Sequence, residues 1–166
     1  MQNKIFTPAK LIWTGSDFTE MSWHDNRLHG IGFVDDFNPH EHELRFDLDY
    51  IHQWVVCEQE KDEQGFWVSP STLVFPSPSE LLINGIEFGG TWILGIARTA
   101  ERNTATTSRT QWKWEISLNT GGTISLWSYG FSQFTRRAPL FVPVPHQSLE
   151  SSRRGPICFD KLTYEC

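Results

Sequence analysis

Hydrophobic and polar residues alternate along one long stretch of the chain. From Glu43 onward the apolar positions are Leu44, Phe46, Leu48 and Tyr50, and the polar positions between them are Arg45, Asp47 and Asp49. A period of two places one set on each face of a β-strand. The pattern therefore predicts a half-buried strand over Glu43–Trp54 with its apolar face in the core.

The segment Gln111–Gly130 has the pattern of a β-hairpin. The apolar residues of its first strand are Trp112, Trp114, Ile116 and Leu118. Asn119–Gly122 then supplies turn residues that tolerate positive φ. The returning strand, Thr123–Tyr129, has apolar residues on both faces, including Trp127. We expect one face to form core and the other to meet a second layer or a partner chain.

Three further strands are predicted at Leu28–Val34, Leu81–Phe88 and Thr91–Arg98, the last two joined tightly at Gly89-Gly90. The polar, Thr-rich segment Thr99–Thr110 is expected to be a solvated loop.

Within the first of these strands, alternation places His29, Ile31 and Phe33 on one side. Gly30 and Gly32 lie on the opposite side, where an aromatic ring from a neighbouring segment can lie flat.

Many short strands separated by turns, with no long amphipathic helix, predict an all-β fold. We expect an antiparallel β-sandwich or a partly open barrel with little helix. The predicted core consists of Ile31, Phe33, Leu44, Phe46, Leu48, Trp114, Ile116 and Leu126.

The chain of 166 residues is expected to form a single domain over residues 1–166, with residues 146–156 as a mobile loop. The formal net charge of −6 argues against a nucleic-acid surface, which needs a basic face. No apolar stretch has the length of a membrane span or a signal peptide, and the three cysteines lack CxxC spacing. These features predict a cytoplasmic protein that binds neither nucleic acid nor membrane.

His and Asp residues are concentrated within nineteen positions near the start of the chain. They are His24, Asp25, His29, Asp35, Asp36, His40 and His42. Imidazole groups suit zinc, so one hypothesis is a metal site formed by His24, His29, His40 and His42. The alternative needs no cofactor: His24-Asp25 is a hydrogen-bonded turn, and His40 and His42 belong to a solvated loop.

Acid–base chemistry is a second hypothesis for the same region. His24 is a candidate base, oriented by Asp25, Asp47 or Asp49. Two buried carboxylates at Asp47 and Asp49 would raise the pKa of one of them. The alternative is the ordinary polar face of a half-exposed strand, where Asp47 contributes little to stability unless it is buried and paired.

The segment from Trp23-His24-Asp25 to Ile51 resembles the opening of small bacterial β-domains, some of which are immunity proteins of toxin systems. This resemblance implies a protein-binding role. No nucleotide-binding or nucleophile motif is present, which favours a non-enzymatic domain that binds a protein partner or self-associates as a homodimer. The candidate binding residues are Trp23, His24, Asp25, His29, Asp47, Asp49 and Trp127. The rival hypothesis is a metal-binding module or a metal-dependent enzyme.

Overall fold

A computed structural model describes residues 6–35, 42–56, 64–87, 89–105 and 108–165. Its elements in chain order are β1 (Ile12–Thr14), the 3-10 helix η1 (Gly15–Glu20), β2 (Asn26–Asp35), β3 (His42–Val55), β4 (Gly65–Pro76), β5 (Ser79–Asn84), β6 (Trp92–Asn103), β7 (Thr110–Leu118), β8 (Thr123–Ser128), β9 (Ser132–Thr135), β10 (Leu140–Pro143) and α1 (Ser151–Arg154). Among the residues that the structure describes, neither helix is long and apolar enough to cross a membrane.

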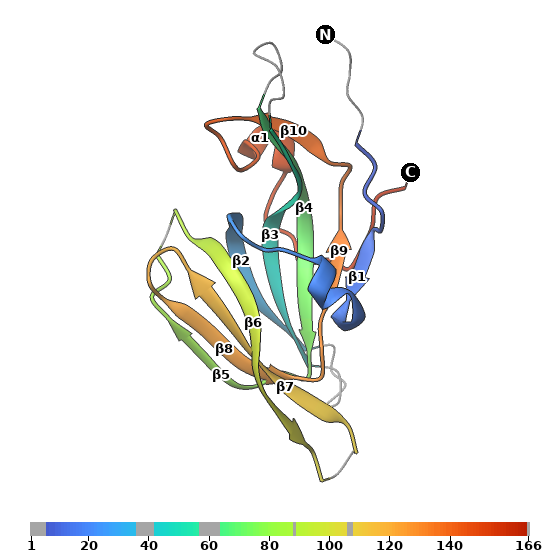
Figure 1. The fold of residues 1–166 in the computed structure, drawn as a ribbon, viewed down its shortest axis with the longest axis vertical. Helices are drawn as coiled ribbons and strands as arrows, with labels where there is room; N and C mark the ends of the chain where they lie inside the picture. The colour runs from blue at the N-terminus through green and yellow to red at the C-terminus, as the bar shows by residue number, and fades with distance from the viewer. Residues whose placement is uncertain (1–5, 36–41, 57–63, 88, 106–107, 166) are drawn as a thin grey trace.

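All the strands belong to one antiparallel sheet in the order β1-β9-β4-β3-β2-β6-β7-β8-β5, with β10 added to β4. The joint between β2 and β6 is short, since only Asn26 and Arg27 pair with Ile93 and Trp92. The sheet turns sharply at this joint, so that β6, β7, β8 and β5 form a second lobe (Figure 1). The predicted all-β, antiparallel fold with little helix is confirmed, and the sheet remains open.

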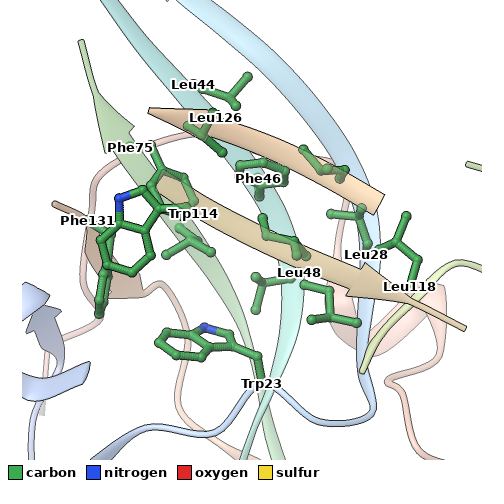
Figure 2. Packing of buried hydrophobic residues seen from close by; sticks show 14 of the residues in the cluster. Trp23, Leu28, Leu44, Phe46, Leu48, Phe75, Trp114, Leu118, Leu126 and Phe131 are labelled. Atoms are coloured by element: carbon green, nitrogen blue, oxygen red, sulfur yellow. The ribbon is translucent and has the colours of Figure 1, made fainter. Parts of the chain in front are cut away.

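The main core lies between the two parts of the sheet. Trp114 of β7 and Leu126 of β8 meet Phe46 and Phe75 of β3 and β4 (Figure 2). The predicted core residues that are at most 1% exposed are Leu44, Phe46, Leu48, Trp114, Ile116 and Leu126. Ile31 is partly buried against this cluster, so alternation correctly identifies most of the core.

The predicted placement of Phe33 in the core is wrong, because its side chain is 67% exposed. β2 pairs with β6 only at Asn26 and Arg27. Beyond these residues β2 pairs with β3 on one side, and no other strand of the described residues pairs with its second edge. Phe33 lies near the end of this edge, opposite Leu44, so it lacks the neighbouring strand that would cover it.

Two other predictions about the strands need correction. β6 continues to Asn103 through a β-bulge between Arg98 and Ala100, so the first part of the expected loop Thr99–Thr110 is a strand. β5 and β6, which correspond to the two strands expected to be joined tightly at Gly89-Gly90, do not pair with each other. β5 pairs with β8, and β6 pairs with β7 and β2.

The C-terminal residues 148–164, which we call the strap, lie over the face of the sheet opposite to the main core. An added Cβ at Gly30 or Gly32 would lie 3.1 or 3.2 Å from the ring of Phe159. The predicted aromatic ring against these glycines is therefore present. The strap is also held by Arg45 and Thr72, which donate hydrogen bonds to the carbonyls of Phe159 and Asp160.

Candidate functional site

Three histidines of the proposed metal site, His24, His29 and His42, lie beside three different carboxylates. Nδ1 of His24 lies 3.1 Å from Asp25, Nδ1 of His42 lies 3.4 Å from Asp35, and Nε2 of His29 lies 3.1 Å from Asp49. His40 lies outside the described residues, as does Asp36. Among the described residues no three His, Cys, Asp or Glu side chains are placed to hold a metal ion. Zinc binding stays a prediction that a zinc titration tests.

His29 is on the opposite face from the one that alternation predicts. A β-bulge between Leu28 and Gly30 shifts the register of β2 against β3. His29 therefore approaches Asp49, on the strap side, although Ile31 and Phe33 face the other way. Its Nε2 atom is close to the carboxylate but is not aligned for a hydrogen bond.

Asp47 and Asp49 form the centre of a buried ion-pair network under the strap. Both side chains are fully buried. Arg154 contacts both carboxylates, and Arg136, which directly follows β9, donates to Asp47 at 2.5 Å. Backbone N–H groups of Cys158 and Leu149 donate to Asp47 and Asp49, each at 3.1 Å.

This network corrects the interpretation of β3 as a half-exposed strand with a polar face. Burial alone would raise the pKa of the Asp49 carboxyl, but His29, Arg154 and the N–H of Leu149 together lower it. At Asp49 the pKa is therefore lowered, and the rise expected for one of the two carboxylates does not occur at this residue. Both carboxylates have their acceptor positions filled from within the protein, which suits a structural role.

The arginines of this network could not be identified from the sequence. Arg154 is 105 positions from Asp49, in the segment expected to be a mobile loop, and α1 places it there with 4% of its surface exposed. Arg136 is 89 positions from Asp47. No local periodicity connects residues so far apart. The adjacent pairs Arg136-Arg137 and Arg153-Arg154 were the only available signal.

Another polar contact, which is partly buried, joins His52 and Ser69, whose Nε2 and Oγ atoms lie 2.7 Å apart. Such a pair resembles a base and a nucleophile. However, Ser69 is fully buried, and burial lowers the pKa of His52 to about 4, which makes it a weak base. The rings of Phe6 and Tyr50 lie 5.8 and 5.0 Å from the imidazole. We therefore assign this pair to the packing of the sheet.

The low pKa of His52 predicts a loss of stability in mild acid. Between pH 6.5 and pH 4 the unfolded state binds a proton that the folded state does not, so the free energy of unfolding falls as the pH falls. We expect a decrease of up to about 3 kcal/mol across this window. Urea unfolding of the His52→Gln variant should show a smaller decrease. The exposed His146→Gln is the control, and an equal pH dependence in both variants would contradict the assignment.

A cavity of about 380 Å³ lies beside η1, at one end of the second lobe. We call it the arginine cavity. Its main side chains are Arg98, Arg109, Trp112, Trp114, Tyr129 and Phe131. Arg98 is on β6, Trp112 and Trp114 are on β7, and Tyr129 directly follows β8. Among the described residues that line it there is no Asp, Glu, His or Cys.

Both arginines of the cavity form cation–π contacts with aromatic rings. The guanidinium carbon of Arg98 lies 4.5 Å from the ring centre of Phe18 and 4.9 Å from that of Trp112. The guanidinium of Arg109 lies 4.4 Å from the ring centre of Tyr129. Within the described parts of the chain, neither side chain forms an ion pair, whereas Arg45, Arg102, Arg136 and Arg154 all do.

The other predicted binding residues lie away from this cavity. Trp23 is buried and donates from Nε1 to Gln133 at 2.8 Å, so it belongs to the core. His24 is exposed beside Asp25. Trp127 faces outward on β8, with the guanidinium of Arg102 at 4.2 Å from its ring centre. The predicted hairpin Gln111–Gly130 is present. The cavity on its inner face could not be predicted from the sequence, because its lining residues come from several separate segments.

No protein-family model matches the chain, and no match is found among curated proteins or solved structures.

Proposed function

We propose that the protein is a non-enzymatic domain that binds another protein through the arginine cavity. The observation that carries this proposal is the grouping of Arg98, Arg109, Trp112 and Tyr129 around one solvent-accessible cavity. Trp, Tyr and Arg are the residues most enriched among those that dominate protein–protein binding energies. The rings of Trp112 and Tyr129 supply contact area, and the guanidinium groups beside them supply charged hydrogen-bond donors.

The lining of the cavity favours binding over catalysis. The hydroxyl groups of Ser16 and Tyr129 line the cavity, but a hydroxyl nucleophile needs a neighbouring base such as His, Asp, Glu or Lys to activate it. No such base is among the described lining residues. Of the residues proposed for acid–base chemistry, His24 lies beside Asp25 away from this cavity, and Asp47 and Asp49 are engaged in the network beneath the strap.

The form of the cavity favours a protein over a small molecule. Small-molecule sites usually enclose most of the ligand surface, whereas Arg98 and Arg109 at this cavity are exposed. The resemblance of the Trp23–Ile51 segment to immunity proteins makes a bacterial toxin the first partner to test. A toxin gene next to this gene would identify the candidate, and the two purified proteins can then be mixed.

Replacing a cavity tryptophan should weaken binding to such a partner. We expect Trp112→Ala to raise the dissociation constant by about tenfold or more, because truncating a dominant interface residue costs roughly 2 kcal/mol. The partner is captured with the wild-type protein, purified, and titrated by calorimetry.

Trp127→Ala is the matched control, since Trp127 is also half-buried but lies on the outer face of β8. Circular dichroism and thermal unfolding establish that both variants fold. If Trp127→Ala abolishes binding and Trp112→Ala does not, the partner binds the outer face and the assignment to the cavity is wrong.

A further inference from the structure

The charge of the arginine cavity differs in sign from that of the whole protein. The chain carries a formal net charge of −6, which by itself suits a basic partner. The cavity instead has two guanidinium groups and, among its described lining residues, no carboxylate. Glu101 lies opposite Trp112 in the pairing of β6 with β7, but it does not line the cavity.

The N–H groups of both cavity guanidiniums have no hydrogen-bond acceptor among the described residues. A guanidinium stacks on an aromatic ring through its flat face, whereas its five N–H groups lie in its own plane and point outward. Neither Arg98 nor Arg109 donates a side-chain hydrogen bond to any residue that the structure describes. The planar fork of a guanidinium is preorganised, so less entropy is lost for each hydrogen bond that it forms to an anion.

We propose that the arginine cavity recognises an oxyanion of the partner protein, and that this oxyanion lies next to an aromatic side chain of the partner. This proposal rests on the proposed function. The guanidinium edges bind the oxyanion in a bidentate manner, and Trp112 and Tyr129 contact the neighbouring ring. The oxyanion can be the carboxylate of an Asp or Glu side chain or the phosphate of a phosphorylated tyrosine. Both sources present the same chemistry to the two arginines.

Three short peptides with the same backbone test this proposal. The acidic probe is acetyl-Gly-Glu-Tyr-Glu-Gly-amide, and the neutral probe has Gln in place of each Glu. The third probe is the neutral peptide with phosphotyrosine in place of tyrosine. Binding is measured by NMR titration of the indole N–H of Trp112.

We expect the acidic or the phosphorylated peptide to bind at least tenfold more tightly than the neutral peptide. Whichever of the two binds more tightly identifies the source of the oxyanion. Arg98→Gln and Arg109→Gln should each weaken this binding at least fivefold, and Glu101→Gln, which removes a nearby negative charge, should not weaken it. Raising the salt concentration from 50 to 200 mM should weaken it as well.

Equal binding of all three peptides, or equal binding by the wild type and both Arg→Gln variants, would overturn the oxyanion proposal. Failure of the proposed function is a separate result, because it is measured with the captured protein partner and Trp112→Ala. If the partner requires Trp112 but binds both Arg→Gln variants normally, the cavity is a protein-binding site that does not recognise an oxyanion.

Discussion

Asp47→Ala should lower the free energy of unfolding by about 3–5 kcal/mol, because it removes one partner of a buried ion-pair network. The Asp47 carboxylate is fully buried and accepts hydrogen bonds from Arg136, Arg154 and the backbone N–H of Cys158. Without it, Arg136 loses its carboxylate partner, and Asp49 is the one carboxylate of the network that remains for Arg154. Urea unfolding at pH 7 measures the effect.

Asp160→Ala is the control for this experiment, since Asp160 lies on the same strap and is exposed. Its backbone carbonyl, which accepts from Thr72, is retained in the variant. We expect a change within about 0.5 kcal/mol for this surface position. Equal effects of Asp47→Ala and Asp160→Ala would show that the buried network does not stabilise the fold.

Phe46→Ala should destabilise the protein by about 3–5 kcal/mol, since it leaves a cavity in the main core. Phe46 is 0% exposed, and its ring packs edge-on against Phe75 with 5.7 Å between ring centres. Thermal or urea unfolding measures this loss.

Phe33→Ala is the matched control, because it removes the same side chain from the neighbouring strand at a position that is 67% exposed. Its effect should stay within about 0.5 kcal/mol. A loss similar to that of Phe46→Ala would mean that Phe33 is covered in solution, for example by a second copy of the chain. Light scattering on the wild-type protein would then test for a homodimer.

Local alternation was sufficient to predict the strands whose two faces differ. In β3, the alternation of Leu44, Phe46 and Leu48 with charged residues identified both the strand and its core face. The hairpin of β7 and β8 could be predicted for the same reason, together with a turn rich in Asn and Gly. These signals are local, because successive side chains of a strand point to opposite faces.

The sequence did not determine what covers each face. The polar residues Asp47 and Asp49 have the pattern of a solvent-exposed face, but the strap with Arg154, together with Arg136, buries them. Phe33 continues an apolar pattern, but β6 leaves β2 before reaching it. In both cases the deciding neighbour is a segment far away along the chain.

The arginine cavity depends on the tertiary structure for the same reason. It brings Arg98 of β6 and Arg109 next to Trp112 and Tyr129, and it is closed on one side by the start of η1. Alternation along a strand reports which side chains share a face, since it reflects the geometry of a single extended backbone. Strand order, bulges and the path of the C-terminal strap result from the sum of many long-range contacts, so they became visible only in the folded molecule.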